Sequence, residues 1–175
     1  SRGENVFASP VNALSSMMRL CIAGQLALMP ASVAILAPGV NAFRRLRKNL
    51  TEPVFNSWGY NTRSAALRIP CSDESNRRIE YRLAGADANP YLVAATILTG
   101  MLYGLEHIDE GDLPEPQHDQ PELPLFQQEA IEAFARCQYL TDSLGDAFSE
   151  QWVACKLSEL DWFERIVTQE ESHLA

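Results

Sequence analysis

Residues 63–92 read RSAALRIPCSDESNRRIEYRLAGADANPYL, and this stretch decides the fold. Residues 64–69 and 77–83 are predicted strands, and Pro70 and the polar run 72–76 separate them. Asn89-Pro90 then puts a capping side chain directly before a proline, which is tolerated at the first position of a helix. The stretch therefore predicts two strands followed by a helix over 90–106.

The second strand carries a charged stripe. Side chains leave alternate faces of a strand, so Arg78, Glu80 and Arg82 share one face. Ile79 and Leu83, with Tyr81 between them, take the opposite face and are expected to contact the core. The polar face thus holds a carboxylate between two guanidinium groups. A solvated sheet face with surface ion pairs is the alternative interpretation of the stripe alone.

Helical spacing and turn residues predict the elements on either side of this stretch. In chain order they are a helix over 12–29 that ends at Pro30, a short helix over 31–36, a basic turn or loop over 41–49, a strand over 54–60, an exposed loop over 111–124, and helices over 127–135 and 148–169. The helix over 90–106 is apolar nearly all round and is expected to be deeply buried. The core candidates on the last helix are Trp152, Leu157, Leu160 and Phe163.

The net charge and the distribution of charged residues indicate which class of ligand the chain can bind. The 175 residues include 14 Lys and Arg and 23 Asp and Glu, and the net charge of −9 argues against a nucleic acid. The basic residues cluster between 44 and 82, whereas the acidic residues concentrate in the second half. This local cationic patch favours a small anionic ligand.

Cysteine usage and hydropathy bear on the compartment. The four cysteines are widely spaced, form no Cys-x-x-Cys pair and have no accompanying histidine cluster, so we expect reduced, mostly buried thiols in a cytoplasmic protein. The apolar run 20–36 is interrupted by Gln25 and Pro30, which makes it a poor membrane span. No membrane partner is expected.

Four blocks carry a family resemblance. They are NAFRRL (41–46), RSAALRIP (63–70), RIEYR (78–82) and ANPYL (88–92), within about fifty contiguous residues. In order and spacing they resemble the glutamine synthetase superfamily, and the resemblance extends over essentially the whole chain. It implies an α+β fold, the C-terminal part of a catalytic domain in which antiparallel strands are covered by helices. The family's N-terminal domain and upstream catalytic segment would precede Ser1.

The resemblance also implies an activity. Such enzymes are ATP-dependent, ADP-forming ligases that activate glutamate as γ-glutamyl phosphate before an amine displaces the phosphate. Arg45 and Arg82 would bind the carboxylates of glutamate, which suits the planar fork of arginine. Arg63 would be catalytic, because it would lie over the transferred phosphoryl group and stabilise its charge.

Nucleotide and metal roles follow from the same resemblance. Arg68 and Arg78 would bind the nucleotide together with Arg63, and Glu80 would be a ligand of Mg²⁺ or Mn²⁺. Their charged neighbours are expected to be solvated, and the histidines to lie at the surface. These residues are Arg44, Arg47, Lys48 and Arg77, and His107, His118 and His173.

Departures from the family pattern leave the identity of the amine acceptor open. Thr51 stands where the family has a flap glutamate that helps to deprotonate ammonium, and Glu52 follows it. The block 84–88 looks closer to γ-glutamylpolyamine synthetases than to true glutamine synthetases. A polyamine-type acceptor is therefore slightly favoured over ammonia, in a homo-oligomeric ring. The alternative is a truncated, non-catalytic assembly partner with the same fold.

Overall fold

Helix α1 (Ser16–Leu36) runs through the centre of the computed structural model, which describes residues 3–10, 13–47, 53–116 and 120–166. Its first turn is capped by Ser15, whose hydroxyl accepts a hydrogen bond from the Met18 amide at 3.3 Å. Its length and composition would allow a membrane span, but 78% of its most apolar window is buried inside the structure. This burial is that of a core helix.

Pro30 lies inside α1, so the predicted end of the helix there is wrong. A proline has no N–H to offer the carbonyl four residues earlier, which is that of Leu26. The side chain of Asn56 donates a hydrogen bond to this carbonyl at 2.9 Å and satisfies it instead. The short helix predicted over 31–36 is therefore the last part of α1.

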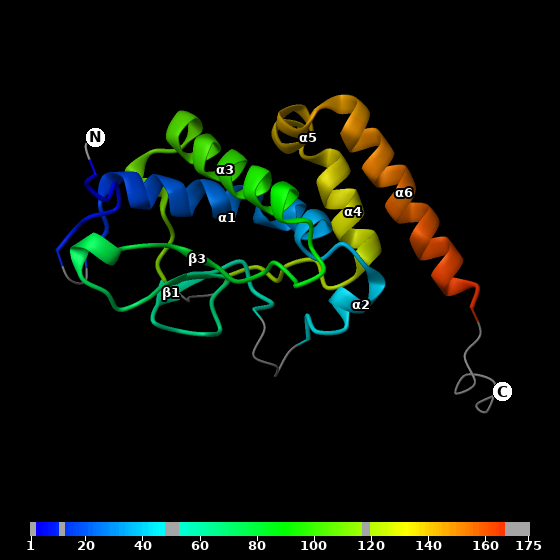
Figure 1. Ribbon diagram of the computed structural model, residues 1–175, viewed down its shortest axis with the longest axis horizontal. Coiled ribbons are helices and arrows are strands. Elements are labelled where there is room, and N and C mark those ends of the chain that lie inside the picture. The colour runs from blue at the N-terminus through cyan, green and yellow to red at the C-terminus, as the bar shows by residue number, and fades with distance from the viewer. Residues whose placement is uncertain (1–2, 11–12, 48–52, 117–119, 167–175) are drawn as a thin grey trace.

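Helix α3 (Pro90–His107) lies along α1, as Figure 1 shows, and has the predicted start. Asn89 caps it by accepting from the amide of Tyr91 at 2.9 Å. The two helices cross through glycines: a Cβ added to Gly24 would lie 2.2 Å from the Gly100 carbonyl oxygen. Contact this close leaves no room for a side chain on either helix at the crossing.

The face of α3 that contacts α1 is consequently made of small residues, and the expectation of deep burial is wrong. The buried residues of α3 are Thr96, Thr99, Gly100 and Gly104. Leu92 and Val93 are half-buried and pack against the core. Other large apolar side chains lie on the outer surface, where Tyr91 is 83% exposed and Leu98 63%. Leu102 and Leu105 are also exposed.

Three short strands form the sheet, in the order β1 (Trp58–Tyr60), β2 (Leu67–Ile69) and β3 (Glu80–Tyr81). Strands β2 and β3 are antiparallel, as expected, but β1 and β2 are parallel. Six residues suffice for this parallel connection because β1 and β2 are each only three residues long. Asn61, with φ of +48°, turns the chain out of β1 and donates its amide to the Ile69 carbonyl at 2.8 Å. The strands are shorter than predicted, and the α+β class is confirmed.

Two predicted loops contain more structure than expected. Helix α2 (Val40–Phe43) begins the segment 41–49, and the short 3₁₀ helices η1 (Glu74–Asn76) and η2 (Glu110–Asp112) precede β3 and follow α3. The loop over 111–124 is not wholly exposed, because Leu113 and Leu123 are buried. The indole of Trp58 also donates a hydrogen bond to the Pro114 carbonyl, at 2.7 Å.

The C-terminal helices are α4 (Gln127–Arg136), α5 (Gln138–Leu144) and α6 (Asp146–Glu164), and they form one end of the molecule (Figure 1). Helix α5 was not predicted. The core prediction for α6 is confirmed for Trp152, which is half-buried and packs against the core. It is wrong for Leu157, which is exposed, and Leu160 and Phe163 are only half-buried. All four cysteines are free thiols, but Cys71 and Cys155 are exposed, Cys137 is half-buried and only Cys21 is buried.

Candidate active site

The charged stripe of β3 meets a third arginine from β2. The register pairs Arg68 directly with Glu80 across the two strands. Arg68 Nη1 lies 2.8 Å from Glu80 Oε2, and Arg78 Nη2 lies 3.0 Å from Glu80 Oε1. The predicted shared face is therefore confirmed for Arg78 and Glu80, and one carboxylate holds two guanidinium groups on a hydrogen-bonded ladder.

Asn61 completes this cluster, and the sequence analysis missed it. Its side-chain oxygen accepts from Arg68 Nη2 at 2.8 Å, so the guanidinium of Arg68 is fixed from two sides. Among the residues that the structure describes, Asn61 is the one non-glycine residue with positive φ. Asparagine tolerates this conformation better than most residues, and an asparagine directly after a strand was the available signal.

Arg82 organises the loop that carries Arg63. The Arg82 amide donates to the Ala66 carbonyl at 2.9 Å, which extends the ladder beyond β3. Its guanidinium donates to the carbonyls of Arg63 and Ala65. Arg63 itself is exposed, so its side chain is free of the core while its backbone is held by Arg82.

Arg45 reaches the same region from the turn after α2. Its Nη2 donates to the carbonyl of Leu83, the residue after Arg82, at 3.1 Å. The structure thus connects Arg45 and Arg82 to the end of the β3 segment, and Arg68, Arg78 and Glu80 to its middle. The ligand-binding, catalytic and metal-binding roles of these residues stay predictions.

The neighbouring charged residues behave differently from one another. Arg44 and Arg47 are exposed, as predicted, and the Arg44 guanidinium lies 5.7 Å from the centre of the Phe163 ring. Arg77 was expected to be solvated but is only 4% exposed. Its guanidinium donates to the carbonyls of Ser9 and Pro10, both at 3.4 Å, which fixes the N-terminal segment against the strand region.

Other predictions on this region have separate outcomes. His107 is exposed, as expected, and its ring lies against those of Tyr103 and Tyr139. The remaining predictions fall on residues outside the described ranges, which are Lys48, Thr51, Glu52, His118 and His173.

Glu80 has the hard oxygen ligands that Mg²⁺ and Mn²⁺ prefer. Within the described ranges, however, no three His, Cys, Asp or Glu side chains gather in a group suited to a metal ion. A single carboxylate does not make a site for these ions, so Glu80 fits the role of one ligand in a larger set and not that of a complete site.

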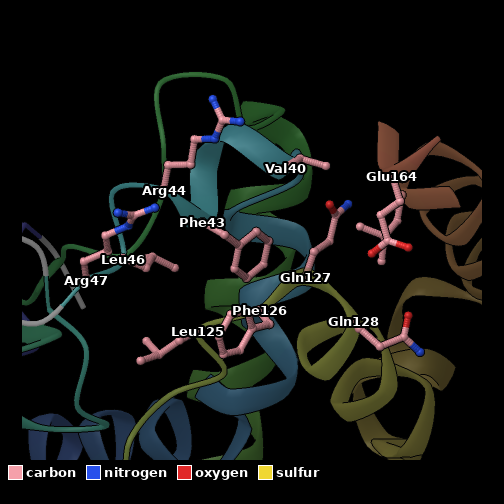
Figure 2. A pocket seen from close by; sticks show the side chains of 11 residues that line it. Val40, Phe43, Arg44, Leu46, Arg47, Leu125, Phe126, Gln127, Gln128 and Glu164 are labelled. Carbon is pink, nitrogen blue, oxygen red and sulfur yellow. The ribbon is translucent and has the colours of Figure 1, made fainter. Parts of the chain in front are cut away.

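A separate hollow of about 500 Å³ lies between α2, the segment before α4 and the end of α6. Figure 2 shows Phe43 and Phe126 in its wall and Arg44 and Arg47 beside it. Its wall includes none of the predicted site residues. Although Arg44 and Arg45 are adjacent in sequence, they serve different parts of the surface.

Known proteins match this chain over almost its whole length. The model of the glutamine synthetase catalytic domain matches residues 1–174. Gamma-glutamylputrescine synthetase of Escherichia coli K12 is 42% identical over 177 residues, which cover 98% of this chain and 37% of that protein. Glutamine synthetase of Pyrococcus woesei is 32% identical, with coverage of 98% and 41%.

A solved structure has the same fold. The structure of GmaS without ligand superimposes with a TM-score of 0.83 and 25% identity, over 97% of this chain and 41% of that one. The chain therefore spans about two fifths of the length of these proteins.

Proposed function

The chain belongs to the glutamine synthetase family, and from this premise we propose that the full-length protein is an ATP-dependent γ-glutamyl amide ligase. The γ-carboxylate of glutamate attacks the terminal phosphorus of ATP, which gives γ-glutamyl phosphate and ADP. An amine then attacks the acyl carbon and phosphate leaves. The observation that carries the proposal is the arginine cluster on β2 and β3, organised by Glu80 and Asn61.

The arrangement of charges supports this chemistry. Two anions, a carboxylate and a triphosphate, must approach each other, so the site must offset their repulsion. Arg68 and Arg78 share one carboxylate and would bind phosphate oxygens with their remaining N–H groups. Arg63 extends from a loop whose backbone Arg82 holds, which suits a cation over the transferred phosphoryl group. Arg45 and Arg82 would bind glutamate.

A polyamine-type acceptor is slightly favoured over ammonia. The 42% identity with a gamma-glutamylputrescine synthetase supports this preference, as do Thr51 at the flap position and the block 84–88. Glu80 would supply one ligand of Mg²⁺ or Mn²⁺, and the metal, when bound, would offset charge that develops during phosphoryl transfer. We further propose a homo-oligomeric ring in the cytoplasm.

Phosphate release by the full-length protein tests the proposal. We expect turnover of ATP only with glutamate present, because the same arginines hold both anions, and faster turnover with putrescine than with ammonium. ATP hydrolysis at a comparable rate without glutamate contradicts the assignment. No turnover with any amine favours the non-catalytic assembly partner.

A clear preference for ammonium that Glu52→Gln abolishes would show that Glu52 serves as the flap glutamate and that the protein is an ordinary glutamine synthetase.

A further inference from the structure

The turn after β3 brings a carboxylate next to Arg45. The Gly85 amide donates to the carbonyl of Leu36, the last residue of α1, at 2.9 Å, and the Ala88 amide closes the turn onto the Gly85 carbonyl at 3.1 Å. The turn is thus bonded to the core helix at its start, is closed by a hydrogen bond of its own and leads into α3. Asp87 lies within this anchored turn, so the position of its backbone is fixed.

Gly85 shows how near the two charged groups are. A Cβ built on Gly85 would lie 2.3 Å from Asp87 Oδ1 and 2.7 Å from Arg45 Nη2. The oxygen and the nitrogen are therefore separated by at most about 5 Å, the sum of these two distances. The other oxygen of Asp87 faces a second glycine, Gly39, at 3.9 Å from its built Cβ. Two glycines leave open the space beside the carboxylate.

Asp87 and Arg45 are close together but form no ion pair with each other. Its side chain is exposed, and nothing within the described part of the chain bonds to its carboxylate. Arg45 directs its Nη2 to the Leu83 carbonyl at 3.1 Å. Asp87 is exposed and Arg45 is half-buried. A cation and an anion at this separation match a ligand that carries a carboxylate and an ammonium group close together.

We propose that Asp87 binds a substrate ammonium group beside Arg45 and thereby helps to set which amine-bearing substrate the protein accepts. The inference rests on the proposed ligase function, in which Arg45 binds a carboxylate of glutamate. Two substrates bring such a group, the α-ammonium of glutamate and the free ammonium of a diamine acceptor. In both cases the bond is a charge-assisted hydrogen bond to a carboxylate.

The test is Asp87→Asn in the full-length protein, which keeps the shape of the side chain and removes its charge. Loss of one charge-assisted hydrogen bond should raise the KM of the substrate concerned about tenfold to a hundredfold. If the group is the α-ammonium, the KM of glutamate rises with every acceptor. If it is the acceptor, the KM of putrescine rises while that of butylamine, which has no second amine, is unchanged.

Glutarate, which is glutamate without the α-ammonium, separates binding from positioning. Its inhibition constant should be unchanged by Asp87→Asn if Asp87 binds an ammonium group, and should rise if Asp87 only positions Arg45. If Asp87 merely lowers the positive potential at Arg45, removal of its charge should instead tighten both glutamate and glutarate. Either of these last two results overturns the proposal.

A second variant and a matched control complete the experiment. Gly85→Ala adds a methyl group against the ends of two flexible side chains, so it should displace the side chains of Asp87 and Arg45. We expect an unchanged melting temperature and a higher KM for the same substrates that Asp87→Asn affects. Glu74→Gln removes an exposed carboxylate in η1 and should change no KM. Unchanged constants for glutamate and putrescine in Asp87→Asn refute the proposal.

Wild-type protein without glutamate-dependent turnover refutes the ligase assignment separately. Titration calorimetry with glutamate and with putrescine then still tests Asp87, because it needs no turnover: equal affinities of the wild type and Asp87→Asn overturn the inference, and weaker binding by the variant supports it.

Discussion

Glu80→Gln distinguishes two possible roles of the Glu80 carboxylate, as a metal ligand and as a member of a surface ion pair. The substitution weakens contacts of 2.8 Å to Arg68 and 3.0 Å to Arg78, in which the Glu80 side chain is 30% exposed and the arginines 24% and 54%. Exposed pairs of this kind contribute about 0.2–1 kcal/mol each, and glutamine keeps one acceptor. The free energy of unfolding should therefore fall by about 1 kcal/mol, which lowers Tm by about 2–4 °C.

The expected effect on catalysis is much larger. A catalytic metal supplies several kcal/mol of transition-state stabilisation, and each 1.36 kcal/mol is tenfold in rate, so turnover should fall by about 10²–10⁴. The assay measures kcat and the half-saturating Mg²⁺ and Mn²⁺ concentrations in the full-length protein. Glu132→Gln is the control, because Glu132 pairs with Arg136 on the surface of α4 at 3.6 Å. Near-normal rates with unchanged metal dependence would refute the ligand role and leave the ion pair as the better account.

Three further predictions concern the rest of the chain. Gly104→Ala places a methyl group 2.0 Å from the Leu20 carbonyl oxygen, so α1 and α3 must separate, and the free energy of unfolding in urea should fall by about 1–3 kcal/mol or more; an unchanged midpoint would contradict the crossing. The Tyr139 hydroxyl donates to the Glu106 carboxylate at 2.7 Å, which raises the pKa of Tyr139 to about 12. The protonated phenol is thus favoured in the folded state, so this contribution to stability is complete below about pH 10 and is lost as the pH rises to about 12. Absorbance titration of wild type minus Tyr139→Phe measures the pKa, which Glu106→Gln should lower; ionisation near pH 10 in both backgrounds would exclude the bond. Residues 1–175 expressed alone should be poorly soluble and inactive, because the outer face of α3 is apolar, and a soluble monomer that forms the amide would disprove this.

Local patterns predicted the parts of the structure that depend on neighbouring residues. The Asn89-Pro90 pair gave the start of α3, because capping and the fixed φ of proline act within one turn. Alternation in the 77–83 segment placed Arg78 and Glu80 on one face, since side-chain direction in a strand depends only on position. Arg68 and Asn61 join this pair through the pairing of β2 with β3 and the turn after β1, and alternation within one strand does not predict those contacts.

Contacts between distant residues explain the failures. Pro30 does not end α1 because its compensating donor is Asn56, 26 positions further along the chain. The sequence of α3 predicted an apolar helix but not which side of it contacts α1. That side is the one with Gly104, because only a glycine fits against the backbone of Leu20. The nearness of Asp87 to Arg45 likewise depends on a turn that no spacing in the sequence reveals.

The most direct test of the central claim follows oxygen from glutamate to phosphate. The full-length protein is supplied with ATP, an acceptor amine, and glutamate labelled with ¹⁸O in its γ-carboxylate. If γ-glutamyl phosphate is the intermediate, one labelled oxygen bridges carbon and phosphorus, and the attack of the amine on carbon leaves it on phosphorus. Mass spectrometry should then find one ¹⁸O in each inorganic phosphate released. Unlabelled phosphate, formed at the same rate as the amide, would contradict the account.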